Sequence, residues 1–150
     1  MDRSEWQRTY EESFPRVFRA LVAIGAHPDE AEDALHDAFE QALARHEHVA
    51  RAEGWLFVVA SRRWRRQRVR SAIFSPLSVL ARSEAPDAPE SELLTELRRL
   101  PLRQRQVLAA RYLLGLSQEE TAAALGIARG TVGAHTSQGL ARLRLLLAVQ

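Results

Sequence analysis

The sequence predicts an all-α protein: two small helical domains joined by a linker, with a helix-turn-helix in the second domain. Apolar residues recur at three- and four-residue steps, and the C-terminal part shows no strand-like alternation. A segment rich in proline and serine separates the two helical parts. Of 150 residues, 46% are hydrophobic and 27% charged, so each domain is expected to bury a core. The predicted boundaries are 1–70, 71–92 (the linker) and 93–150.

The first domain begins with a helical apolar face. Its members share one side of a helix and are Trp6, Tyr10, Phe14, Val17, Phe18, Leu21 and Val22. Pro15 lies within this run and predicts a kink or a restart of the helix.

Two more helices are predicted in the first domain. Pro28 opens one of them, and acidic residues follow it at the positive end of the helix dipole. Its apolar stripe is Ala31, Ala34, Leu35, Ala38, Phe39, Ala42 and Leu43. The next helix is expected from about Trp55 to Val69, after a loop around Gly54.

A helix-turn-helix is predicted between Ser117 and Val132. Ser117 and Glu120 have the spacing of a capping box, which starts a helix. Gly126 suits the left-handed turn that ends it. A small residue at Ala122 and a β-branched residue at Val132 fit the places where the two helices cross and pack.

Charge alternates steeply along the chain, and all 21 basic residues are arginine. Residues 1–50 have 5 arginines against 11 acids, and residues 51–82 have 8 against 1. Residues 83–97 have 5 acids and no arginine, and residues 98–150 have 8 arginines against 2 acids. This alternation predicts two cationic surfaces separated by an acidic connector.

The first cationic surface is a helix with six arginines in nine residues. They are Arg62, Arg63, Arg65, Arg66, Arg68 and Arg70. Like charges spaced over about 13 Å of helix repel one another and favour a polyanionic partner. Trp64 lies among them, and two interpretations stay open: a core residue, or an aromatic ring on which a DNA base stacks.

The second cationic surface is the second helix of the helix-turn-helix. Such a helix enters the major groove by its N-terminal part, while Arg and hydroxyl side chains bind phosphates. The predicted DNA-binding residues are Arg129, Thr131, His135, Gln138 and Arg142. For His135 a solvated position and a DNA contact are both open.

Several classes of function are disfavoured. The absence of cysteine excludes disulfides, zinc knuckles, thiol catalysis and iron–sulfur ligation. The apolar runs are shorter than the roughly 20 residues of a membrane span, so a cytoplasmic protein without membrane insertion is expected. A metal-dependent hydrolase built on His36, Asp37, His46 and His48 is disfavoured because His36 and Asp37 are adjacent and do not share a helix face. No enzyme activity, cofactor or metal is therefore expected.

The two halves together resemble the extracytoplasmic-function sigma factors of bacterial RNA polymerase. YEESFPRVF at 10–18, DEAEDALHDAF at 29–39 and WLFVVA at 55–60 are similar to region two of that family. LPLRQRQVL at 100–108, LSQEETAAALG at 116–126 and GTV at 130–132 are similar to region four.

The resemblance implies a promoter-specificity factor that binds core RNA polymerase and promoter DNA. It implies that Asp33, His36, Asp37 and Glu40 dock on the polymerase. The loop 46–54 and the arginine helix would melt the promoter, the linker would thread a polymerase channel, and the second domain would read the upstream element as duplex.

The sequence departs from the family pattern at four positions. Gly133 and Gln138 replace basic residues, His36 replaces glutamine, and Ala128 replaces a hydroxyl cap. An anti-sigma factor is left open as a partner. The alternative function is a stand-alone helix-turn-helix regulator with an N-terminal sensor or dimerisation lobe.

Overall fold

The computed structural model describes residues 2–45, 51–74 and 91–148. These residues contain helices and no strand. The helices are α1 (Arg3–Ile24), α2 (Pro28–Arg45), α3 (Ala52–Phe74), α5 (Glu92–Leu97), α6 (Leu102–Leu108), the π-helix η1 (Ala109–Leu113), α7 (Gln118–Leu125) and α8 (Arg129–Ala148). The predicted all-α class and the helix-turn-helix are confirmed.

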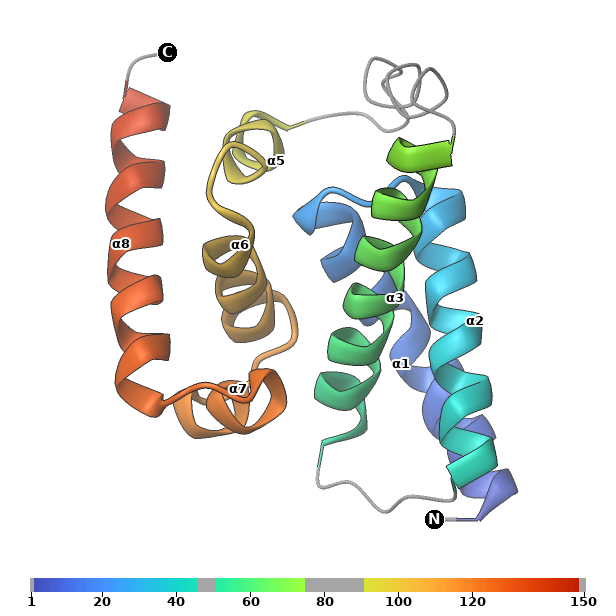
Figure 1. Cartoon of the computed structure of the whole chain (residues 1–150). Coiled ribbons are helices and arrows are strands. Elements are labelled where there is room, and N and C mark those ends of the chain that lie inside the picture. The colour runs from blue at the N-terminus through green and yellow to red at the C-terminus, as the bar shows by residue number, and fades with distance from the viewer. Residues whose placement is uncertain (1, 46–50, 75–90, 149–150) are drawn as a thin grey trace.

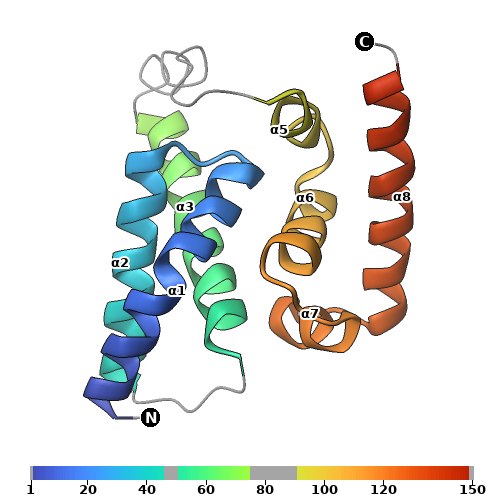
Figure 2. The same ribbon diagram turned by 180° about the vertical axis from the view of Figure 1, so that it is seen from behind.

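The helices form two lobes that lie side by side (Figures 1 and 2). The first lobe is α1, α2 and α3, and the second is α5, α6, η1, α7 and α8. In both views α8 lies at the outer edge, on the far side of α6 and α7 from the first lobe. One face of α8 therefore points away from the rest of the molecule.

Caps explain several helix ends. Asp2 closes a capping box with Glu5 at the start of α1, and Pro28 is the first residue of α2, as predicted. Pro15 lies inside α1, so the predicted restart does not occur. Buried residues after Pro15, such as Val17 and Leu21, hold that half of α1 against the core.

The arginine helix is longer than predicted. It runs from Ala52 to Phe74 and so includes the first four residues of the predicted linker. The second lobe starts at Glu92 behind a Ser91 cap, whose hydroxyl accepts from the Leu94 amide at 3.1 Å. Residues 75–90 of the predicted linker and 46–50 of the predicted melting loop lie outside the described residues.

The two lobes do not bury separate cores. The larger hydrophobic cluster combines Trp6, Leu21 and Leu56 of the first lobe with Val107 and Val132 of the second. The smaller cluster joins Ala23 of α1 to leucines of α5, α6 and α8. Side chains from both lobes thus share one interior, which differs from the expectation of a core in each domain.

Candidate nucleic-acid interface

The arginine helix α3 divides its charges between two faces. Arg62, Arg65, Arg66 and Arg70 are exposed and pair with no acidic group in the described part of the chain. Together with Val69, which is 60% exposed, they line a shallow groove of about 500 Å³. Four guanidinium groups around an apolar floor suit a ligand that has both phosphates and apolar surface.

The other two arginines of α3 turn toward α2. Arg63 Nε lies 2.9 Å from Asp37 Oδ2, and Arg68 Nη1 lies 3.8 Å from Glu30 Oε1. Arg63 is a predicted DNA-binding residue and Asp37 a predicted polymerase-binding residue. The structure therefore brings together one member of each predicted set, in an ion pair that is partly exposed.

Trp64 is buried. Its side chain is 6% exposed, and its ring lies over Gly25 at the end of α1, where an added Cβ would meet Trp64 Cη2 at 3.4 Å. The indole Nε1 has no hydrogen-bond partner among the described residues. Of the two interpretations of Trp64, the core position is the one that this structure adopts, and base stacking on the ring is not available here.

The predicted polymerase-binding residues lie on one side of α2. Asp33, His36 and Glu40 are exposed, and Asp37 is half-buried beside Arg63. Their spacing of three and four residues places them on neighbouring turns of the helix. Asp33 and Asp37 also line a cavity of about 190 Å³ between α2 and α3.

An aromatic cluster borders this side of α2. Tyr10 stacks on Phe39 with ring centroids 4.3 Å apart, and the His36 ring lies 6.0 Å from Tyr10 and 6.4 Å from Phe14. Burial, together with the nearby Glu32 charge, raises the pKa of Tyr10 to about 12. Tyr10 is therefore neutral at physiological pH, and the charge of this face comes from the carboxylates of α2.

The helix-turn-helix has the predicted local geometry. The Ser117 hydroxyl accepts from the Glu120 amide at 3.0 Å, and the Ser117 amide donates to the Glu120 carboxylate at 2.8 Å. The hydrogen bond from the Ser117 amide is the main cause that lowers the pKa of Glu120. Gly126 adopts the left-handed conformation with φ 68° and ψ 35°, and Val132 is fully buried. These contacts fix α8 against α7.

Four of the five predicted contacts on α8 are exposed. Arg129, Thr131, Gln138 and Arg142 reach the surface, whereas His135 is half-buried. The His135 Nδ1 atom is buried and has no partner among the described residues. Arg129 forms an exposed ion pair with Glu119 of α7, with 3.1 Å between Nη2 and Oε1. The exposed positions of α8 thus include two arginines and two neutral hydrogen-bonding side chains.

Sequence reasoning missed Gln118, which packs against the start of α8. Its Nε2 donates to the Arg129 carbonyl oxygen at 2.9 Å. A Cβ added at Gly133 would lie 2.8 Å from the same Nε2 atom. The signal that could have found this pair was the glycine at a position where the family has a long side chain.

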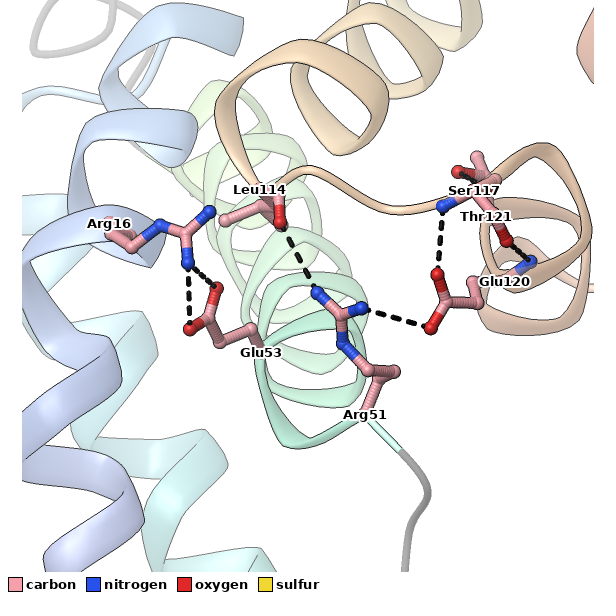
Figure 3. Close-up of polar contacts among 7 residues, drawn as sticks. All are labelled: Arg16, Arg51, Glu53, Leu114, Ser117, Glu120 and Thr121. Carbon is pink, nitrogen blue, oxygen red and sulfur yellow. Dashed lines mark hydrogen bonds and ion pairs between the residues drawn. The ribbon is translucent and has the colours of Figure 1, made fainter.

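Sequence reasoning also missed four arginines that join the lobes. Arg51 donates to the Leu114 carbonyl oxygen at 3.4 Å and pairs with Glu120 at 3.0 Å (Figure 3). Arg16 pairs with Glu53 at 3.2 Å and reaches the Leu113 carbonyl oxygen at 3.5 Å. Two arginines of the first lobe thus bind carbonyl groups at the end of η1.

Arginines of the second lobe also donate to backbone carbonyl groups of the first lobe. Arg98 donates to the Val22 carbonyl oxygen at 2.9 Å, and Arg105 donates to the Ile24 carbonyl oxygen. The last turn of α1 has no basic residue of its own, so these guanidinium groups complement the negative end of its dipole. Burial, and the nearby Arg98 charge, lower the pKa of Arg105.

The described residues contain neither a candidate metal site nor a candidate membrane-spanning helix. Residues 2–45, 51–74 and 91–148 contain no group of three or more His, Cys, Asp or Glu side chains that could hold a metal ion. His46 and His48 lie outside those ranges. No helix within them is long and apolar enough to cross a membrane.

A helical chain with an exposed arginine face and a helix-turn-helix is a DNA-binding protein. Residues 90–143 match the family described as "Sigma-70, region 4". The RNA polymerase sigma-E factor of Streptomyces coelicolor is 33% identical over 96% of this chain and 85% of its own length. The sigma-E factor of Streptomyces avermitilis is 31% identical over 96% of this chain and 84% of its own length.

Solved structures share the fold. The sigma factor RpoE of Bartonella quintana, in complex with the anti-sigma factor NepR, has a TM-score of 0.77 and 21% identity, covering 97% of this chain and 98% of its own. CnrH in complex with the cytosolic domain of CnrY has a TM-score of 0.74 and 20% identity, covering 99% and 91%.

The chain belongs to the extracytoplasmic-function sigma factors of bacterial RNA polymerase. The likeness to the sigma-E factors extends over 96% of the chain and so includes both lobes. As a sigma factor, the protein acts with core RNA polymerase in promoter recognition and transcription initiation. The alternative of a stand-alone regulator explains only the helix-turn-helix.

Proposed function

We propose that the two lobes divide the work of a sigma factor between them. The first lobe docks on core polymerase through Asp33, His36, Asp37 and Glu40, and its arginine helix holds the opened promoter strand. The second lobe reads the upstream element as duplex through α8. The supporting observation is that the exposed arginines of α3 and the exposed residues of α8 lie in different lobes.

The proposed division predicts which arginines act in promoter opening. Arg65 and Arg66 are exposed and form no ion pair with a described residue, whereas Arg63 is held by Asp37. We therefore expect Arg65→Gln/Arg66→Gln to reduce promoter opening and to leave core binding intact. Arg3→Gln/Arg8→Gln is the matched control, because it removes the same charge from exposed positions of α1.

The test is reconstitution with core polymerase and transcription from genomic fragments. Core binding is measured by co-elution, and opening by permanganate reactivity of unpaired thymines. Failure of the unmodified chain to bind core or to initiate transcription would refute the assignment. Loss of core binding in the Arg65→Gln/Arg66→Gln variant would mean that the helix is structural or docks on polymerase.

We also propose that a protein inhibitor regulates this chain and that the chain acts in the cytoplasm. Both structural neighbours are complexes, one with the anti-sigma factor NepR and one with the cytosolic domain of CnrY. By analogy, an anti-sigma factor is the proposed regulator of this chain, which acts in the cytoplasm without catalytic activity or cofactor. An inhibitor isolated with the chain from its own cells must stop transcription when added in equimolar amount to the reconstituted system.

A further inference from the structure

Three carboxylates share the side of α2 that contains His36. Glu32 and Asp33 lie one helical turn before His36, and Glu40 lies one turn after it. Each of the three is exposed and pairs with no basic group among the described residues. His36 is exposed as well, so its imidazole is open to solvent protons at the centre of a negatively charged surface.

Two aromatic rings of α1 border His36. The centroid of its ring lies 6.0 Å from that of Tyr10 and 6.4 Å from that of Phe14, with interplanar angles of 37° and 33°. Tyr10 in turn stacks on Phe39 of α2. These ring contacts give the imidazole a defined place beside the carboxylates, so a change of its charge acts at a defined point of the surface.

Of the described side chains on this side of α2, His36 is the one whose charge changes near neutral pH. The helix packs against α1 and α3. From α1, Tyr10 and Phe14 face His36, and Tyr10 stays neutral because burial raises its pKa to about 12. From α3, Arg63 Nε lies 2.9 Å from Asp37 Oδ2. Carboxyl and guanidinium groups keep their charges between about pH 5 and 8, whereas imidazole changes its charge in that range.

The charge of His36 decides how well this surface suits a basic partner. The proposed polymerase-binding residues are three acids, Asp33, Asp37 and Glu40, together with His36. An acidic surface is complementary to a basic one, and a neutral imidazole leaves that complementarity intact. An imidazolium places a positive charge among the carboxylates and repels basic groups of the partner.

We propose that His36 makes the docking of this chain on core polymerase sensitive to pH, with the neutral imidazole docking more tightly than the imidazolium. This inference rests on the proposed role of α2 in docking. A partner that prefers the neutral form drives the proton off His36, so docking releases protons in the range where histidine changes its charge. Acidification therefore weakens docking.

The first experiment measures the dissociation constant of the full chain and core RNA polymerase at about pH 5.5 and about pH 8. For the unmodified chain the constant should be about three- to tenfold higher at the lower pH, as expected for one opposing charge a few ångströms from its partner. The readout is the ratio of the two constants within one variant, because a lost contact changes both constants equally.

Two variants fix the charge at position 36. His36→Gln is neutral and His36→Lys is positive throughout this pH range, so both should lose the pH dependence that the unmodified chain shows. His27→Gln removes the other histidine of the described first lobe. It is the control and should keep the ratio of the unmodified chain.

The second experiment counts the protons exchanged on docking. Calorimetric titrations at about pH 6.5 in buffers of different ionisation enthalpy give this number. Docking of the unmodified chain should release more protons than docking of His36→Gln, by up to about one. A purely structural role of His36 would leave the number unchanged.

The outcomes separate this inference from the proposed function. An unmodified chain that binds core polymerase at neither pH refutes the proposed function. If it binds and His36→Gln gives the same ratio of constants, His36 does not control docking and the inference is wrong. Tighter docking of the unmodified chain at the lower pH also overturns it, because the imidazolium would then meet an acidic group of the polymerase.

Discussion

At the scale of single residues, Arg129, a proposed DNA contact of α8, is paired with a neighbouring acid. Arg129 is 67% exposed and pairs with Glu119, which is 58% exposed. Such a surface pair contributes about 0–1 kcal/mol, so a DNA phosphate can readily replace the carboxylate. The carboxylate of Glu119 nevertheless stays close to the approaching phosphate and repels it. With α8 as the proposed reader of duplex DNA, we therefore expect Glu119 to limit its affinity for DNA.

The Arg129–Glu119 ion pair predicts that Glu119→Gln strengthens promoter binding. Removing the carboxylate frees Arg129 and relieves repulsion, which we expect to raise affinity about two- to fivefold at low salt, with the gain fading as salt increases. The change in affinity is measured as binding of the holoenzyme to a promoter duplex at a series of salt concentrations. Glu12→Gln makes the same change of charge on the exposed surface of α1, and equal gains in both variants would show a general effect of charge.

At the scale of elements, two glycines of α8 have opposite roles. A Cβ added at Gly139 would lie 2.9 Å from Leu108 Cδ1 and 3.4 Å from Leu108 Cγ, so this glycine sets the close packing of α6 on α8. A Cβ added at Gly130 meets nothing within 4 Å. The same substitution thus tests tertiary packing at one site and helix propensity at the other.

We expect Gly130→Ala to stabilise the protein and Gly139→Ala to destabilise it. The first gains up to about 1 kcal/mol of helix propensity. The second gains the same amount but overpacks the α6–α8 contact, which costs typically about 1–3 kcal/mol. Urea unfolding followed by circular dichroism gives both free energies. A Gly139→Ala variant as stable as Gly130→Ala would mean that Leu108 moves aside freely.

Local chemistry explains why these elements could be predicted and where prediction stopped. The starts of α2 and α7 follow from Pro28 and from the Ser117 capping box, which act within one turn. The sequence could not decide whether Trp64 is buried or exposed, because its neighbours in sequence are arginines, whereas its neighbour in space is Gly25 at the end of α1. The pairing of Gln118 with Arg129 uses a backbone carbonyl, which no pattern of side chains reveals.

At the scale of the whole molecule, arginines of each lobe bind backbone carbonyls of the other. The contacts of Arg51, Arg98 and Arg105 join residues 63 to 81 positions apart in sequence. A buried hydrogen bond of 2.8 Å between Gln106 and Ser61 adds a side-chain link between α6 and α3. The lobes are thus joined by polar contacts as well as by the shared hydrophobic core.

Acid should weaken the contacts of Glu120, which accepts from the Ser117 amide at the start of α7 and pairs with Arg51 of the first lobe. The pKa of Glu120 is lowered in the folded chain from its ordinary value of 4.5, chiefly by the Ser117 hydrogen bonds and also by Arg51. Its stabilisation is therefore present above pH 4.5 and is lost as pH falls through the lowered pKa. Thermal unfolding should show Glu120→Gln less stable than the unmodified chain at pH 7 and equal to it in strong acid. A difference that persists in strong acid would contradict this origin.

The arginine caps on α1 should hold the lobes together more strongly than arginines that act within one lobe. Arg98→Gln/Arg105→Gln removes both guanidinium groups that donate to the last turn of α1. Arg99→Gln/Arg103→Gln changes neighbouring arginines, of which Arg99 pairs with Glu96 inside the second lobe. The chain has no cysteine, so cysteines introduced at the exposed Ser71 and Ala141 can be labelled for energy transfer. We expect lower transfer in the first variant only, because carbonyl groups at the lobe boundary that lose their guanidinium donors favour solvation by water. Equal transfer in the two variants would mean that the shared hydrophobic core alone sets the distance between the lobes.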